Sequence, residues 1–291
     1  MNNLLAIITP AKNESANVSD LVKSVCEQSL IPDLWIFVND SSTDDTEKRF
    51  REEVGLYSDF VNKCDIQIVK HSYGRNEYAL GNKYSRVVNY GMQFLKEYET
   101  INGSAFNYVG VLDCDVFPER LYYEKLIGKM RMNDKIGIAA GGTHFEFYPD
   151  GRYFTTICSQ THAPGGCRVW RKNCLDQTGY FISISQDSVS EARAIMLGWQ
   201  VRSFSDISVR MRKRGGKSSF RYYGESEYIR WIPSWYFYLK AAKLYIKGHH
   251  QSAKDYVYGY SRAKQENLPR LTDPLAKKYY RYRLYYKLIG K

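Results

Sequence analysis

The sequence predicts an α/β fold, with a mainly parallel central sheet flanked by helices and a basic helical extension at its C-terminal end. Along the first half of the chain, short apolar segments rich in β-branched residues alternate with segments whose apolar residues recur at helical spacing. Strands that alternate with helices in this way pair mostly in parallel, with helices over both faces of the sheet. A change in composition after residue 226 indicates the extension.

The first half contains five expected strands and four expected helices. The strands are predicted at residues 4–9, 34–38, 66–69, 108–112 and 136–140. The helices are predicted at residues 18–25, 44–53, 81–98 and 118–132. The last helix is expected to begin at Pro118, because proline is tolerated in a first turn, where its missing N–H removes no hydrogen bond.

Polar clusters follow the first, second and fourth expected strands. The carboxyl ends of parallel strands meet at one edge of a sheet, and ligands bind in the crevice beyond that edge. The three clusters are therefore expected to form one site. The second half of the chain is less regular, with a helix expected at residues 187–197, a strand at 201–204 and a mobile basic loop at 212–217.

The charge of the chain is concentrated at its C-terminal end. The whole chain carries +11, and residues 227–291, with 14 Lys/Arg and 4 Asp/Glu, contribute +10 of it. The same segment holds 12 of the 26 tyrosines. We therefore expect two parts, a nearly neutral domain over residues 1–226 and a basic, Tyr-rich helical extension over residues 227–291.

Length and composition exclude several classes of protein. With 291 residues, 44% of them hydrophobic, the chain can bury a sizeable core, and the lack of an apolar run of 18 residues predicts no transmembrane helix. The first residues lack the basic segment and cleavage site of an export signal, so we expect a cytoplasmic protein with reduced cysteines. The spacing of Cys158, His162, Cys167 and Cys174 is too irregular for a zinc site.

Asp113 and Asp115 follow the fourth expected strand. Residues i and i+2 of an extended segment point to the same side, so the two carboxylates are expected together at the mouth of the sheet. Paired carboxylates suit a hard divalent ion that keeps several waters and also takes phosphate oxygens. Such an ion would neutralise the charge that develops on a diphosphate leaving group. The alternative is a solvated pair of acids at a strand end.

Two more acidic residues follow the first two strands. Asp40 can accept from a nucleobase N–H or a ribose hydroxyl, because Asp44 or Thr43 is available to cap the next helix. Glu14 can bind ribose, or can simply favour the first turn of the helix that follows it.

Two charged residues near helix starts complete the candidate site. Asp187 opens a helix, where a carboxylate stays ionised and can take a proton, and an ordinary helix cap is the alternative. Lys83 lies near the start of another helix and opposes its dipole, so an anionic partner is expected unless the side chain is simply solvated.

In these motifs the chain resembles family 2 of the inverting glycosyltransferases, which have the GT-A fold. The matching segments are residues 8–14, 38–44, 81–91, 113–115, 166–179 and 186–187. They look like the family's opening proline–aromatic–Asn–Glu motif, its Val-Asp-Asp-Gly-Ser-Thr-Asp motif, its glycine–lysine–Asn helix, its DxD motif, its acceptor-side segment and its Glu-Asp pair. The six motifs occur in the family's order.

The resemblance implies transfer of a sugar from a nucleotide-diphosphate donor to an acceptor hydroxyl, with inversion. Asp187 would deprotonate that hydroxyl, which attacks the anomeric carbon opposite the leaving diphosphate. Asp115 would be the main ligand of Mg²⁺ or Mn²⁺, with Asp113 near the metal and the ribose. The residues expected around the rest of the donor are Pro10, Lys12, Glu14, Asp40 and Lys83.

Three departures from the family pattern bear on these expectations. Asn39 replaces the first aspartate of the second motif, and Lys12 replaces the aromatic residue near the base. Met211 stands where many members have a histidine that helps to bind the metal or the diphosphate. The arginines on either side of Met211 can bind the diphosphate directly.

The end of the extension predicts an amphipathic helix. Its apolar stripe consists of Leu275, Tyr279, Tyr282, Tyr286 and Ile289, with lysines and arginines away from it. Such a helix suits an anionic membrane surface, where a glycan or polyprenyl-phosphate-linked acceptor would lie. The alternative is that the tyrosines pack on the rest of the chain or form a dimer contact.

Three other functional classes remain open. A sugar-nucleotide pyrophosphorylase should carry a glycine-rich phosphate loop after the first strand, and residues 9–15 contain no glycine. A nucleic-acid-binding protein would fit the basic extension but not the acidic motifs, so no nucleic acid is expected as a partner. A non-catalytic protein that binds nucleotide sugars would share every motif above.

Overall fold

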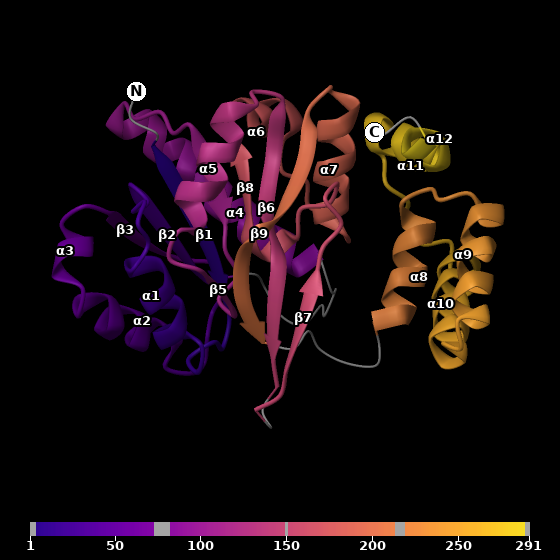
Figure 1. Cartoon of the computed structure of the whole chain (residues 1–291), viewed down its shortest axis with the longest axis horizontal. Helices are drawn as coiled ribbons and strands as arrows, with labels where there is room; N and C mark the ends of the chain where they lie inside the picture. The colour runs from indigo at the N-terminus through magenta and orange to yellow at the C-terminus, as the bar shows by residue number, and fades with distance from the viewer. Residues whose placement is uncertain (1–3, 73–81, 149–150, 213–218, 289–291) are drawn as a thin grey trace.

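One mixed sheet runs through the body of the molecule, flanked by helices (Figure 1). The computed structural model describes residues 4–72, 82–148, 151–212 and 219–288, and within them the sheet has nine strands. The strand order is β3-β2-β1-β4-β8-β6-β9-β5, with β7 paired to β6. The predicted α/β fold with a helical C-terminal end is confirmed.

The first half of the sheet is parallel, as predicted. β1 (Leu5–Ala11) lies between β2 (Leu34–Asn39) and β4 (Tyr108–Val111), and β2 also pairs with β3 (Asp65–Lys70). β2 and β4 are buried along their whole length, which is why they appear in the sequence as continuous apolar runs. The helices of this half are α1 (Val18–Cys26), α2 (Thr46–Gly55), α3 (Ser58–Val61) and α4 (Asn82–Asn102).

The second half of the sheet mixes both directions. β8 (Arg168–Arg171) is antiparallel to β4 and to β6 (Ile136–Phe147), whereas β6 is parallel to β9 (Gln200–Arg212). β6 and β9 extend well past the predicted segments, and their register shifts at two points, between Ile136 and Ile138 and between Gly141 and Thr143. The remaining elements of the body are β7 (Tyr153–Ile157), η1 (Gly165–Cys167), α6 (Lys172–Thr178) and α7 (Gln186–Met196). Of the predicted basic loop, only Arg212 lies in the described residues.

The predicted helix start at Pro118 is wrong. Val116–Pro118 form a short strand, β5, which is antiparallel to β9 at the edge of the sheet. The following helix, α5 (Tyr122–Met132), begins four residues later. Proline is tolerated in an edge strand, where its missing N–H removes no ladder hydrogen bond.

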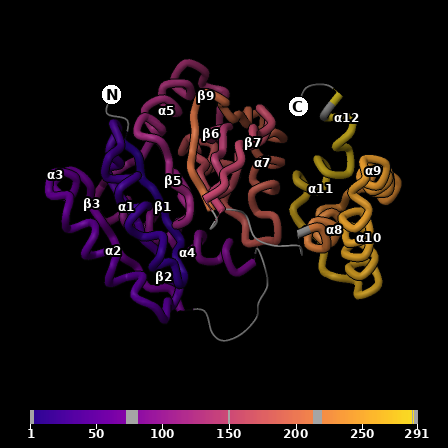
Figure 2. Tube along the Cα trace, turned by 60° about the horizontal axis from the view of Figure 1, so that its bottom comes forward, coloured from indigo at the N-terminus to yellow at the C-terminus, as the bar shows by residue number. Residues whose placement is uncertain are grey.

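The C-terminal helices form a bundle with a core of its own. They are α8 (Ser219–Ile229), α9 (Ser234–Ile246), α10 (His250–Gln265), α11 (Pro274–Arg281) and α12 (Arg283–Leu288). Phe237 of α9 stacks on Tyr260 of α10 at 3.9 Å between ring centroids. The same core includes Val189 and Ala192 of α7, so the bundle packs beside this helix (Figure 2). The predicted boundary between residues 226 and 227 lies inside α8, and the division into two domains stays a prediction.

The predicted C-terminal stripe does not form one continuous helix. Tyr282 separates α11 from α12 and is 52% exposed, whereas Tyr280, which is off the stripe, is buried. Asp273 caps α11 by accepting from the Ala276 N–H at 2.8 Å, and it also pairs with Arg193 of α7. These contacts dock α11 on the body, as in the packing alternative. Ile289 lies outside the described residues.

Helices α8 and α10 cross at a pair of glycines. A Cβ on Gly259 would overlap the backbone oxygen of Arg221, and one on Gly224 would overlap that of Tyr256. Backbone atoms cannot rotate away from such an overlap, so the crossing needs a residue without a side chain at both positions.

Gly259→Ala is therefore expected to destabilise the protein by about 1–3 kcal/mol or more, because the methyl group forces the helices apart. The matched control is Gly128→Ala in α5, where a new Cβ has nothing within 4 Å. That change should stabilise by up to about 1 kcal/mol through helix propensity. Urea unfolding followed by circular dichroism measures both variants, and equal midpoints would contradict the close crossing.

Candidate functional site

Three of the predicted acidic residues line one pocket. Asp113, Asp115 and Asp187 face a hollow of about 290 Å³ near the end of β4. The other lining residues are Val116, His144, His162, Pro164, Gly165, Gly166, Cys167 and Met211. Segments far apart in the sequence therefore converge here, and Met211 lies among them.

Asp113 and Asp115 lie on a turn and not on an extended strand. β4 ends at Val111, and the Asp113 carbonyl accepts from the Val116 N–H at 3.1 Å. The predicted reason for their proximity is therefore wrong, because a turn and not strand alternation brings both to the pocket. Asp113 is held on two sides: its N–H donates to the Gly166 carbonyl at 2.8 Å, and its Oδ1 accepts from the Tyr84 hydroxyl at 2.6 Å.

Gly165 and Gly166 lie directly against two of these carboxylates. A Cβ on Gly165 would overlap the carboxylate of Asp187, and a Cβ on Gly166 would overlap that of Asp113. The two acids thus sit on either side of one glycine turn, and a larger residue at either position would push a carboxylate out of place. Of this pair, only Gly166 lies in a segment that matches the family from the sequence, residues 166–179.

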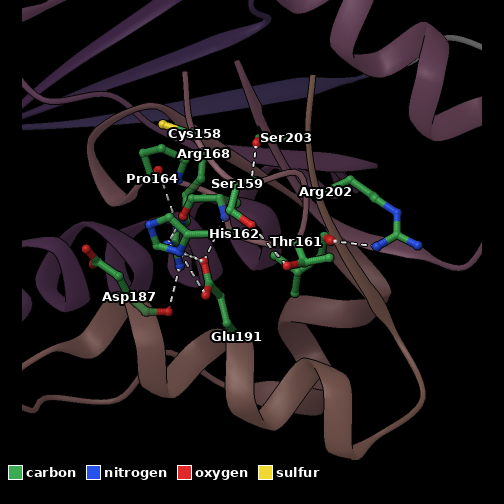
Figure 3. Close-up of polar contacts among 12 residues, drawn as sticks. Cys158, Ser159, Thr161, His162, Pro164, Arg168, Asp187, Glu191, Arg202 and Ser203 are labelled. Carbon is green, nitrogen blue, oxygen red and sulfur yellow. Dashed lines mark hydrogen bonds and ion pairs between the residues drawn. The ribbon is translucent and has the colours of Figure 1, made fainter. Parts of the chain in front are cut away.

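Arg168, which the sequence analysis did not single out, fixes the turn to α7 (Figure 3). Its fully buried guanidinium donates to the Asp187 carbonyl at 3.0 Å and to the carbonyls of Ala163 and Pro164. It also pairs with Glu191 at 3.3 Å. A buried charge without such partners would be strongly destabilising. The position of Asp187 therefore depends on this residue.

Glu191 and His162 lie beside Asp187. The Glu191 carboxylate accepts from the Ala163 N–H at 2.8 Å and lies 2.9 Å from Nδ1 of His162. In Figure 3 the imidazole ring lies between the side chains of Asp187 and Glu191. From the sequence, His162 was discussed only as a member of a zinc site that its spacing argues against. Its position shortly before the glycine pair was the one feature of the sequence that could have indicated a place at this site.

Asp40 lies in a second cluster and does not line the pocket. Lys83 Nζ is 3.3 Å and Lys12 Nζ 3.5 Å from Asp40 Oδ2. Nδ1 of His71, a residue not predicted for the site, is 3.0 Å from Asp40 Oδ1. The carboxylate is 5% exposed, whereas the two lysine side chains are 43% and 38% exposed. Three residues predicted for the donor therefore contact one another, with both lysines still accessible.

Glu14 lies within electrostatic reach of the acidic pocket. Burial raises the pKa of Glu14, a hydrogen bond from Asn17 opposes this, and the negative charge of Asp115 raises it further. Arg212, the last residue of β9, acts in the opposite direction, and its N–H donates to the Asp115 carbonyl at 3.3 Å. Pro10 lies on β1, in register with Val38.

Asp113 and Asp115 are too few to complete the coordination of a divalent ion. In the described part of the chain, no group of three or more His, Cys, Asp or Glu side chains is arranged to hold a metal. Asp113 and Asp115 would leave most coordination positions to water and phosphate oxygens. That arrangement fits Mg²⁺ or Mn²⁺ bound together with a diphosphate.

Comparison with known families decides the classification. The profile described as Glycosyl transferase family 2 matches residues 6–193. The chain belongs to this glycosyltransferase family. The matched region runs from β1 to α7 and contains every residue that lines the pocket except Met211. A sequence search of curated proteins found no match.

Solved glycosyltransferase structures are similar to this chain at low sequence identity. The mannosyltransferase PcManGT from Pyrobaculum calidifontis, in complex with GDP-Man and Mn²⁺, has a TM-score of 0.53 at 13% identity and covers 99% of this chain and 81% of that chain. S. aureus TarS 1–349 in complex with UDP-GlcNAc has a TM-score of 0.47 at 14% identity, over 74% of this chain. This chain spans 60% of the TarS 1–349 chain. The likeness to PcManGT supports the fold.

Replacing Glu14 by Gln is expected to stabilise the protein at neutral pH. The pKa of Glu14 is raised in the folded state, so ionisation favours the unfolded chain as pH rises through that pKa. Gln removes the charge and can still accept from Asn17. The gain in melting temperature should be present at about pH 7.5 and shrink toward about pH 4.

The exposed Glu52 on α2 offers a matched control, since Glu52→Gln removes a carboxylate of the same kind from the surface. Its melting temperature should follow the wild type across the same pH range. A gain for Glu14→Gln that is the same at every pH would contradict the electrostatic reason.

Proposed function

We propose that this glycosyltransferase moves a sugar from a nucleotide-diphosphate donor to an acceptor hydroxyl with inversion at the anomeric carbon. The observation that carries the proposal is the convergence of Asp113, Asp115 and Asp187 on one pocket, with two of them against the same glycine turn. One side of the pocket thereby offers carboxylate ligands for a metal ion that would bind the diphosphate, and the other offers a base.

Asp113 and Asp115 receive the diphosphate end of the donor. They would hold Mg²⁺ or Mn²⁺, with Asp115 as the main ligand, and the ion would neutralise the charge that develops on the leaving diphosphate. The hydrogen bond from Tyr84 keeps Asp113 oriented. The backbone of Arg212 is hydrogen-bonded to that of Asp115, and its positive charge acts on Glu14 in the same region. The Mn²⁺ in the PcManGT structure supports a divalent ion.

The nucleoside end of the donor belongs to the second cluster. Asp40 would accept from the base, with Pro10 and Glu14 beside the nucleoside. Lys12 and Lys83 pair with Asp40 at 3.5 and 3.3 Å. Because both lysines are partly exposed, they can turn from Asp40 toward the phosphates of a bound donor.

Asp187 is the proposed general base. It lies in the first turn of α7, where the helix dipole favours a carboxylate. Ser185, in the left-handed conformation at φ 60°, occupies the N-cap, so the Asp187 carboxylate is not consumed in capping. It would take the proton of the acceptor hydroxyl as the hydroxyl oxygen bonds to the anomeric carbon and the bond from that carbon to the diphosphate breaks.

The acceptor we propose is a glycan or a polyprenyl-phosphate-linked sugar. A cleft of about 680 Å³ between the body and the bundle lies next to the start of α7. Isoleucines and leucines line it together with Arg221, Arg262, Arg270 and one acid, Glu225, which pairs with Arg262. Tyr222, also in its lining, accepts through its hydroxyl oxygen from the Ser185 N–H at 3.3 Å. A mixed apolar and basic cleft beside the base suits an acceptor that carries both apolar and anionic parts.

A thermal-shift screen of UDP-, GDP- and dTDP-sugars with and without Mn²⁺ tests donor binding. One donor should raise the melting temperature selectively, and more so with Mn²⁺; saturation at about 100 times Kd corresponds to about 2.7 kcal/mol. Asp115→Ala should remove the Mn²⁺-dependent part, whereas Asp59→Ala, an exposed acid on α3, should not. A screen in which no sugar nucleotide stabilises the wild type would overturn the donor assignment.

Asp187→Asn is expected to lower transfer by about 10²–10⁴-fold, the usual contribution of a general base. The amide is similar in size to the carboxylate, so binding of the donor should stay close to that of the wild type. Release of nucleoside diphosphate in the presence of acceptor measures the first quantity, and the thermal shift measures the second. Full activity in this variant would assign the proton to another group.

A further inference from the structure

Helix α9 carries an apolar face that none of the described residues covers. Its inner side packs into the bundle through Phe237 and Ala241, which are buried. Five large apolar side chains on its outer side are at least half exposed. They are Trp235 (57%), Tyr238 (50%), Leu239 (60%), Tyr245 (54%) and Ile246 (84%).

These residues lie on one side of the helix. At 3.6 residues per turn, Trp235, Leu239 and Ile246 point in nearly the same direction, roughly opposite to Phe237 and Ala241. A surface helix of a soluble domain normally turns polar residues to the solvent. In both views α9 lies at the outer edge of the bundle, away from the sheet (Figures 1 and 2). The face is therefore accessible to a partner.

The segment that carries this face has only positive charges. Residues 228–254 contain five Lys/Arg and no Asp or Glu. Lys243 and Lys247 are exposed and follow one edge of the apolar face along the helix. Tryptophan and tyrosine flanked by lysines are typical of an element that lies at a lipid–water interface.

We propose that α9 docks the protein on an anionic lipid bilayer, lying in the plane of the surface. The apolar face would enter the boundary between headgroups and acyl chains, and Lys243 and Lys247 would face the lipid phosphates. Charge selects this partner over a second copy of the chain, because pairing two α9 faces would bring their lysines together. Among the described residues no helix is long and apolar enough to cross a membrane, so the contact is with one surface.

This assignment differs from the one expected from the sequence, which placed the membrane contact on the stripe that ends at Ile289. Tyr280 in that region is buried and α11 is docked on α7, whereas the α9 face has no such cover in the described structure. The inference does not depend on the proposed sugar transfer, so each can fail alone.

Flotation of the full chain tests the inference, using vesicles of phosphatidylcholine alone or with about 30% phosphatidylglycerol. The wild type should float with the anionic vesicles. The double variant Leu239→Asp/Ile246→Asp should lower the bound fraction at least about tenfold, because two carboxylates replace the inserted side chains. The matched control is Ile101→Asp/Met132→Asp, two residues of the body that are 81% and 90% exposed, and it should float like the wild type.

Removal of charge provides an independent arm. Lys243→Gln and Lys247→Gln should each weaken binding to the anionic vesicles by about fivefold. Lys96→Gln, on the exposed surface of α4, is the corresponding control. Circular dichroism and the melting temperature confirm that each variant is folded.

Three results would overturn the inference. The first is a wild type that does not float with anionic vesicles. The second is a double α9 variant that floats as well as the wild type, and the third is a body control that loses binding to the same extent. A chain that is dimeric by light scattering, becomes monomeric in the α9 variant and never floats would assign the face to a second copy instead.

Discussion

The buried guanidinium of Arg168 joins the segments that must meet for the pocket to exist. It lies on β8, in the middle of the sheet, and reaches the loop before the glycine turn, the backbone of Asp187 and the carboxylate of Glu191. Each contact satisfies a group that would otherwise be buried without a partner. The sheet, the glycine turn and α7 are thus joined by one buried ionic cluster, and this cluster helps to position the carboxylates of the pocket.

The pocket beside Arg168 brings several negative charges close together. Asp113, Asp115 and Asp187 line a small hollow, and burial raises the pKa of Glu14, with the negative charge of Asp115 adding to that rise. Arg212 offsets this only in part. A site that holds like charges together stores electrostatic free energy that a cation or a phosphate-bound metal would release. The same arrangement would be costly in a purely structural part of the fold.

Much of this architecture could be predicted from the sequence, because local patterns determine it. The buried parallel strands appear as apolar runs, and the acidic residues appear where those runs end. Pro118 was misplaced because proline suits both a helix start and an edge strand, and only the pairing with β9 distinguishes the two. Arg168, Glu191 and His162 were not predicted as a group, since their role lies in contacts between distant segments and no local pattern marks them. The outer face of α9 could not be told from its inner face for a related reason: without the bundle, its inner and outer apolar residues look alike.

The hydroxyls of Tyr222 and Ser226, both on α8, meet Ser185, the residue at which α7 begins. The bundle therefore makes side-chain contacts with the end of α7 that carries Asp187. A displacement of α8, for instance when the bundle binds to a large surface, would be transmitted through two side chains to Ser185, two residues before Asp187. Docking of the bundle and catalysis at Asp187 would then be mechanically linked.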